Sequence, residues 1–226
     1  MAAGANPKNC ICLDSKGVIH PKRQDIDWEK YPNKKHAAWE TKPKIVGSSA
    51  EALEGADVVI GFSKPGSFTT KDVTKMSDRA IIFACANPIP EIDPIATAAL
   101  ENVIVVGTGR SDFPNQVNNS LFFPGCMAGT LAVGGTTISD DMVIAGATTL
   151  ANQTESPSAQ NILPAMTLKN MSEISPNVAE SVAETAIKEG TARFKKPLDQ
   201  IHTEVQTRIL HNQKVLKALA EANLLS

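Results

Sequence analysis

Basic clusters, long apolar runs and metal-binding cysteine motifs are all absent from this sequence of 226 residues. Its 22 Lys and Arg residues are balanced by 24 Asp and Glu residues and form no basic stripe, which argues against a nucleic-acid surface. No apolar run reaches the roughly 18 residues that a transmembrane helix needs. The first residues lack the basic and apolar regions of a secretory signal peptide. We therefore expect a cytoplasmic protein that binds neither membranes nor nucleic acid.

Cysteine is scarce, and the spacing of Cys10, Cys12, Cys85 and Cys126 includes no CxxC pair. The four His residues are scattered as well, so the sequence argues against a zinc site. Cys10 and Cys12 alternate along a predicted strand, which would place them on one face. Reduced and mostly buried thiols are the favoured interpretation.

Short apolar runs alternate with helical patterns in the first half of the chain. Residues 10–13, 57–62, 80–86 and 102–108 do not alternate apolar with polar side chains, which is typical of strands buried on both faces. Helical signals lie between these runs, among them a capping box formed by Ser48-x-x-Glu51. The alternation predicts an α/β fold with a parallel sheet and flanking helices.

Helical signals alone follow Gly125. Ser139 is predicted to cap a helix whose first turn carries two Asp residues, as the helix dipole favours. A second helix is predicted to begin with Ser175 as its N-cap and Pro176 at its first position, and to stop at Gly190. The last part of the chain has an apolar stripe at helical spacing, which indicates a helix that packs against something.

Each predicted strand ends in a polar or glycine-rich segment. Ligands of open parallel sheets bind at the carboxyl ends of the strands. Asp14, after the first run, could accept hydrogen bonds from the ribose hydroxyls of a dinucleotide and repel a 2′-phosphate. The other ends are GFSKPG at 61–66, ANPIPE at 86–91 and GRSDFPNQVNN at 109–119. An ordinary turn explains each segment taken alone, but four such ends on one sheet edge favour a ligand site.

The longest distinctive string is GTGRSDFPNQVNNSLFFPG, residues 107–125. Together with ANPIPEI (86–92) and SPNVAESVAETA (175–186), it resembles the C-terminal, NAD-binding half of malic enzymes of the small prokaryotic type. The resemblance implies a partial Rossmann-like domain over residues 1–193 and a helical extension over 194–226.

A malic enzyme catalyses the oxidative decarboxylation of malate to pyruvate and CO2 with reduction of NAD or NADP, so the resemblance implies this reaction. It further implies a bound Mg²⁺ or Mn²⁺ ion and a homodimer in the complete enzyme. By motif match, it assigns malate contacts to Asn87 and Asn119, and cofactor contacts to Asp14, Gly61, Ser63, Asn87 and Asn118.

The sequence also departs from the family pattern. By comparison with that pattern, we expect it to lack the first Rossmann strand, the glycine-rich turn that holds the pyrophosphate, the metal carboxylates and the catalytic Tyr and Lys. We therefore expect neither a catalytic residue nor a metal ligand in this chain, exposed edges on the neighbouring strands, and no turnover by the chain alone. Cys126, Met127 and Ala128 follow FPG, where the family often has a larger residue and an Arg.

Two other interpretations stay open. The chain could be a non-catalytic nucleotide-binding or regulatory Rossmann module, or part of another NAD enzyme such as an amino-acid dehydrogenase. The PNQVNN loop argues against the latter. Asp14, without an Arg directly after it, favours NAD over NADP, whereas the nearby Lys16 weakens that preference.

Overall fold

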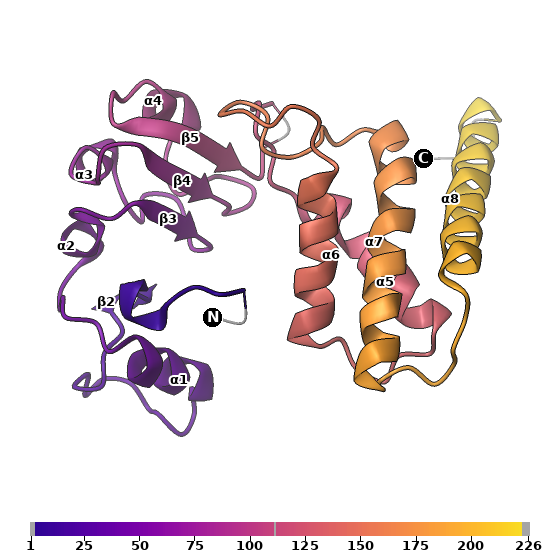
Figure 1. The fold of residues 1–226 in the computed structure, drawn as a ribbon. Coiled ribbons are helices and arrows are strands. Elements are labelled where there is room, and N and C mark those ends of the chain that lie inside the picture. Colours follow the sequence, from indigo (N-terminus) through magenta and orange to yellow (C-terminus); the bar gives the residue numbers. More distant parts are fainter. Residues whose placement is uncertain (1–2, 111, 223–226) are drawn as a thin grey trace. The chain divides into compact units, whose positions relative to one another are not determined.

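The computed structural model describes residues 3–110 and 112–222, and the chain divides into two compact units, Met1–Val117 and Asn118–Ser226 (Figure 1). Among the described residues, the strands lie in the first unit and the long helices in the second. The predicted α/β class with a helical C-terminal part is confirmed. No helix in the described part of the chain is long and apolar enough to cross a membrane.

The core of the first unit is a parallel sheet of three strands in the order β3 (Val58–Gly61), β4 (Ala80–Ala84) and β5 (Val103–Thr108). Val59 pairs with Ile82, and Ile82 pairs with Val106, so these side chains share one face. Three of the four apolar runs in the sequence therefore form the predicted parallel strands.

Two short helices, α2 (Ser49–Leu53) and α3 (Thr70–Val73), supply side chains to the core on this face, and a third, α4 (Pro94–Ala98), contacts β5. The start of α2 carries the predicted capping box of Ser48 and Glu51, and the side chains of Thr69 and Asp93 cap α3 and α4. Burial of Leu53 and Val73 against Ile82 stabilises the unit by roughly 2 kcal/mol for each side chain. The opposite face of β3 is more open, since Val58 and Ile60 are 46% and 58% exposed.

The first apolar run does not join the parallel sheet, so the prediction of a buried strand over residues 10–13 is wrong. Instead β1 (Leu13–Asp14) pairs antiparallel with β2 (Gly17–Val18) in a separate two-stranded sheet. Gly17 makes this hairpin feasible because its φ is +112° and a Cβ there would lie 2.2 Å from the Gly47 carbonyl oxygen. The end of this run therefore pairs locally, and it has no pairing with β3, β4 or β5.

Cys10 and Cys12 precede β1, so the prediction that they share a strand face is wrong as well. All four thiols are free, with Cys126 buried and the others half-buried. The remaining elements of this part are η1 (Pro7–Asn9) and α1 (Pro32–Thr41). Trp28 and Trp39 pack edge to face with ring centroids 5.1 Å apart.

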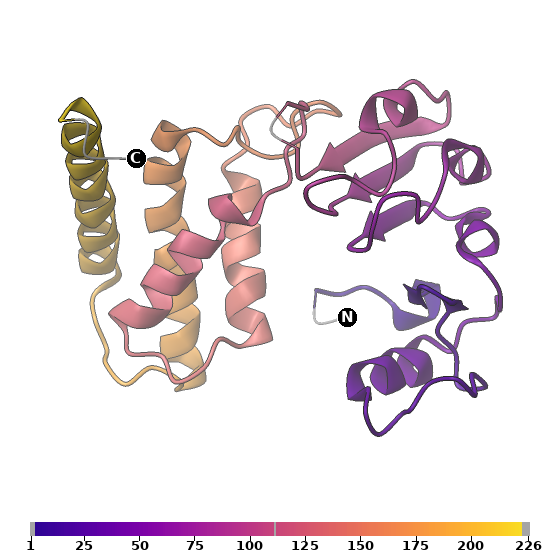
Figure 2. The ribbon, with the colours of Figure 1, turned by 180° about the vertical axis from the view of Figure 1, so that it is seen from behind.

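The second unit is a helical bundle of α5 (Phe123–Ala132), α6 (Asp140–Asn152), α7 (Leu168–Glu189) and α8 (Leu198–Glu221), preceded by η2 (Asn119–Leu121) (Figure 2). Helix α7 contacts each of the other three. Its buried Val178 and Val182 pack in one core with Met142 of α6 and Ile201 of α8. The predicted apolar stripe of the last helix is thus accounted for by packing on α7.

Two glycines of α5 allow it to approach α7 closely. A Cβ at Gly125 would lie 2.6 Å from the Ser175 carbonyl oxygen, and one at Gly129 would lie 2.2 Å from that of Ala179. Both distances are shorter than real Cβ contacts, and both obstructing atoms belong to the backbone. Helices α5 and α7 could not keep this separation with larger residues at these positions.

The start of α7 differs from the prediction. The helix begins at Leu168, where the Thr167 hydroxyl accepts a hydrogen bond from the Asn170 N–H at 3.1 Å, whereas Ser175 and Pro176 are buried in its interior. An interior proline removes one helical hydrogen bond, and the burial of the surrounding apolar side chains offsets that cost. The other predicted boundaries are confirmed, with Ser139 capping α6 and Gly190 ending α7 at φ +76°.

Candidate functional site

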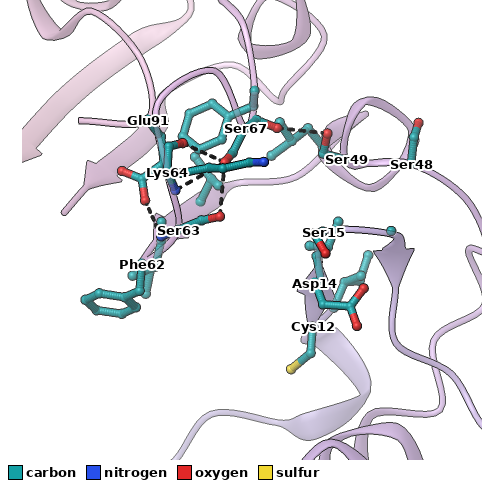
Figure 3. Close-up of a pocket in the computed structure, with 18 of the residues that line it drawn as sticks. Cys12, Asp14, Ser15, Ser48, Ser49, Phe62, Ser63, Lys64, Ser67 and Glu91 are labelled. Carbon is teal, nitrogen blue, oxygen red and sulfur yellow. Dashed lines mark hydrogen bonds between the residues drawn. The ribbon is translucent and has the colours of Figure 1, made fainter. Parts of the chain in front are cut away.

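A pocket of about 800 Å³ opens in the first unit between the β1–β2 hairpin and the end of β3 (Figure 3). Three of the residues predicted from the sequence, Asp14, Gly61 and Ser63, line it together. Asp14 ends β1, Gly61 ends β3, and Ser63 lies in the turn that follows. The structure therefore unites two of the strand ends that the sequence singled out.

Glu91 also lines the pocket and lies beside Ser63 (Figure 3). It is 1% exposed, and its Oε1 accepts a hydrogen bond from the Ser63 N–H at 2.6 Å while its Oε2 accepts one from the Ala86 N–H at 3.0 Å. A Cβ at Gly61 would lie 2.6 Å from the Glu91 carboxyl carbon. Glu91 thus joins the turns after β3 and β4, and only glycine leaves room for its carboxylate.

The turn after β3 is held by a chain of serine hydroxyls (Figure 3). The Ser67 hydroxyl donates to the Lys64 carbonyl at 2.7 Å and is bonded to the Ser63 hydroxyl at 3.1 Å. The Ser49 hydroxyl donates to the Ser67 carbonyl at 3.1 Å. These hydrogen bonds join residues of the turn to one another and to Ser49 of α2, and they hold the turn as one side of the pocket.

Asp14 is held by cations on the opposite side of the pocket. Its Oδ1 accepts from Arg23 Nη1 at 3.0 Å and from the Lys16 N–H at 2.9 Å. Its Oδ2 accepts from Lys34 Nζ at 2.6 Å and from Arg23 Nη2 at 3.4 Å. A carboxylate has about four lone-pair sites, and here all four are engaged.

These contacts extend into a cluster of three cations and two carboxylates. Arg23 also donates to Asp25 through Nε at 2.6 Å and Nη2 at 2.7 Å, and Lys16 Nζ lies 3.1 Å from Asp25. Burial raises the pKa of Asp14, but hydrogen bonds from Lys34, Arg23 and the Lys16 amide outweigh it and lower that pKa from 3.8 to about 2. Hydrogen bonds from Arg23 also lower the pKa of Asp25.

The lowered pKa of Asp14 predicts an acid-sensitive contribution to stability. Because the folded-state pKa lies below the unfolded one, the contribution is complete above about pH 4 and is lost as the pH falls through about 2. Its size is about 2 kcal/mol. In urea titrations followed by tryptophan fluorescence, the stability gap between wild type and Asp14→Asn should shrink by this amount between pH 5 and pH 2.

A gap of equal size at both pH values would contradict the assignment of the ion pairs. Lys34→Met is the matched comparison, because it leaves the carboxylate in place and removes one of its two charged partners. We expect it to retain part of the pH dependence through Arg23.

The pocket suits a dinucleotide in position and size, because it lies at the carboxyl ends of β1 and β3 and joins apolar walls to a few polar groups. A ribose hydroxyl that binds Asp14 would have to replace one of its present donors. The Lys34 ammonium is the one carried on a long, half-exposed side chain. Asp14 therefore does not offer a free carboxylate, and binding of a ribose there would exchange one donor for another.

The three predicted asparagines are not among the residues that line this pocket. Asn87 is exposed after β4 and does not line the pocket. Asn118 and Asn119 belong to the second unit, where the Asn118 side chain caps η2 by accepting from the Ser120 N–H at 2.9 Å. Their assignments to substrate and cofactor stay predictions. Ser111 of the same loop lies outside the described residues.

The sequence reasoning gave no role to Glu91, Arg23 or Lys34. Glu91 lies in the ANPIPE segment, which the sequence analysis singled out for its asparagine. The signal that could have indicated a buried role for Glu91 is its position just before the apolar Ile92. Arg23 and Lys34 reach Asp14 from 9 and 20 residues away, so no local pattern marks them. The buried Asn115 is also structural, since its Nδ2 donates to the Val106 carbonyl at 3.0 Å.

Metal binding has no candidate within residues 3–110 and 112–222, where no three His, Cys, Asp or Glu side chains are grouped to hold an ion. What the pocket itself offers is a carboxylate with adjacent cations, a tight glycine turn and a fixed backbone.

Comparisons with known proteins agree with this description. A family model described as "Malic enzyme, NAD binding domain" matches residues 2–187. An NADP-dependent malic enzyme of Halomonas elongata is 37% identical over 210 residues, which cover 87% of this chain and 48% of that protein. An NAD-dependent malic enzyme of Geobacillus stearothermophilus is 37% identical over 193 residues, or 85% and 39% of the two chains.

Among solved structures, the crystal structure of the Entamoeba histolytica malic enzyme matches with a TM-score of 0.90 and 37% identity. The match covers 99% of this chain and 46% of that one. The chain thus spans about half the length, or less, of these relatives.

Proposed function

Because the chain belongs to the malic enzyme family, we propose that it provides the dinucleotide-binding part of an oxidoreductase that converts malate to pyruvate and CO2. The single observation that carries the proposal is that Asp14, Gly61 and Ser63 line one pocket at the carboxyl ends of two strands. This pocket lies within the residues that match the NAD-binding family model.

Each residue then has a role that follows from its chemistry. Asp14 accepts a ribose hydroxyl, while Gly61 and Ser63 let the backbone approach the dinucleotide. Asn87 and Asn119 hydrogen-bond malate, and Asn87 and Asn118 contact the nicotinamide region. The divalent cation, Mg²⁺ or Mn²⁺, is bound by residues outside this chain, and the complete enzyme is a cytoplasmic homodimer.

The cofactor that we propose is NAD, because a carboxylate at the end of β1 disfavours a 2′-phosphate. Two observations keep NADP in the comparison. Arg23 and Lys34 compensate the charge of Asp14, which weakens that repulsion. The named relatives also include both NADP-dependent and NAD-dependent malic enzymes.

Calorimetric titration of the chain with NAD and with NADP tests the proposal. We expect NAD to bind and Asp14→Asn to weaken it about tenfold, since a charged hydrogen bond to the ribose is lost. The same variant should weaken the binding of NADP less, because removing the Asp14 carboxylate also removes its repulsion of the 2′-phosphate. Asp78→Asn is the matched control, as it removes an exposed carboxylate outside the pocket.

Failure of the wild-type chain to bind either dinucleotide, or equal loss in both Asp variants, would argue against the proposal. An assay with malate, NAD and Mn²⁺ completes the test. We expect no turnover from the chain alone, and turnover above background would show that its own residues perform the chemistry. Binding without any contribution to turnover in the complete enzyme would favour a non-catalytic nucleotide-binding module.

A further inference from the structure

A buried carboxylate borders the pocket. Glu91 is 1% exposed, lines the pocket, and lies so close to Gly61 that a Cβ there would be 2.6 Å from its carboxyl carbon (Figure 3). Its two oxygens accept hydrogen bonds from the backbone amides of Ser63 and Ala86. This arrangement suits the ionised carboxylate, because both oxygens face donors. The amides are neutral, so they leave the negative charge of Glu91 uncompensated.

The two carboxylates of the pocket differ in their surroundings. Asp14 forms ion pairs with Arg23 and Lys34, which balance its charge. Glu91 belongs to none of the ion pairs within residues 3–110 and 112–222. The lysines that line the pocket are exposed, so solvent screens their charges. A buried charge is screened much less, and Glu91 therefore gives its end of the pocket a negative potential.

The effect of this charge extends to a neighbouring thiol. Cys85 directly follows β4 and is half-buried. Burial raises the pKa of the Cys85 thiol, and the negative charge of Glu91 raises that pKa further, because a thiolate would add a second negative charge. The same potential that disfavours an anion at this end of the pocket would favour a cationic group of a ligand.

The proposed cofactor has such a group at the corresponding end. With its adenosine ribose at Asp14, a dinucleotide would extend along the strand ends toward the turns after β3 and β4. Asn87, our proposed contact of the nicotinamide region, directly follows Ala86, whose amide Glu91 holds. The nicotinamide ring carries a positive charge in NAD and none in NADH. The charge of Glu91 therefore distinguishes the two forms at the one ring in which they differ.

We propose that Glu91 is a specificity-determining residue that makes the site favour the oxidised cofactor over the reduced one. The inference rests on the proposed function, in which oxidation of malate consumes NAD and forms NADH. The carboxylate attracts the charged ring of NAD and gives no such attraction to NADH, so it favours binding of the substrate form and release of the product form. Its hydrogen bonds to the Ser63 and Ala86 amides, in contrast, support the binding of both forms equally.

The test compares the affinities of the chain for NAD and for NADH by calorimetric titration. We expect the wild-type chain to bind NAD more tightly, and Glu91→Gln to lower the ratio of the NAD and NADH affinities about tenfold, the scale of a charge interaction in a partly buried site. A turn that is merely loosened would weaken both forms alike and leave the ratio unchanged. Asp14→Asn is the matched control, because it removes a pocket carboxylate at the ribose that both forms share, and its ratio should equal that of wild type.

Three results would overturn the proposal: an unchanged ratio in a folded Glu91→Gln protein, tighter binding of NADH than of NAD by the wild-type chain, or loss of the wild-type preference at high salt, which would assign it to exposed charges. Circular dichroism shows whether the variant folds, and the two wild-type measurements decide the matter if it does not. If neither NAD nor NADH binds, the proposed function fails as well. Binding of both forms with an unchanged ratio removes this inference alone.

Discussion

Glu91→Ala is expected to destabilise the first unit by about 3 kcal/mol, one of the two largest effects that we predict. Removing the carboxylate leaves the N–H groups of Ser63 and Ala86 without their acceptor, and each unsatisfied buried donor costs about 1–3 kcal/mol. The measurement is urea unfolding followed by tryptophan fluorescence. Both tryptophans of the chain, Trp28 and Trp39, lie in the first unit, so the signal reports that unit.

Glu101→Ala is the matched control, because Glu101 is an exposed glutamate in the same unit and its replacement should stay within about 0.5 kcal/mol. Replacement of Glu91 should also lower the affinity for the ligand. Since Glu91 holds the Ser63 amide in place, a folded Glu91→Gln protein is expected to bind NAD more weakly than wild type. If Glu91→Ala costs less than about 1 kcal/mol, the carboxylate does not hold the two turns together.

The second large effect concerns Gly129→Ala in α5. In an isolated helix this change is stabilising by about 1 kcal/mol, because alanine has the higher helix propensity. Here the new methyl group would meet the Ala179 carbonyl oxygen at 2.2 Å, and overpacking against a backbone atom costs typically 1–3 kcal/mol or more. We therefore expect a net loss of about 2 kcal/mol, with the sign opposite to that of propensity.

The free energy of unfolding of this variant is measured by urea unfolding followed by far-ultraviolet circular dichroism, because the long helices of the second unit dominate that signal. Thr148→Ala provides the control for propensity alone, since Thr148 is exposed in α6 and its replacement should stabilise the protein slightly. A stabilising effect of Gly129→Ala would mean that α5 and α7 separate easily. Tryptophan fluorescence of the first unit should be unchanged in both proteins.

The parts of the fold that could be predicted are those encoded locally. Continuous apolar runs identified β3, β4 and β5, and the Ser139 and Gly190 signals marked helix ends correctly. The run at residues 10–13 has the same pattern but a different outcome. Whether such a run joins a sheet depends on its neighbours in space, and Gly17 supplied a closer partner.

The start of helix α7 also could not be predicted from local signals. In the sequence, Pro176 predicts the start of a helix. In the structure the helix continues on both sides of Pro176, because the residues around it are buried by packing. At the site, the rule that ligands bind at strand ends and the family resemblance singled out Asp14, Gly61 and Ser63, which line one pocket, and their roles in binding stay predictions. They could not find Arg23, Lys34 and Glu91, whose roles depend on side chains that reach the strand ends from other segments.

The edge position of β3 in the sheet of the described residues also has a consequence for the lifetime of the chain in a cell. Residues 58–62, VVIGF, are apolar, uncharged and free of proline, and such a segment on an open edge is what chaperones and proteases recognise in unassembled proteins. Any change that exposes more of this edge is therefore expected to lower the abundance of the chain in a cell.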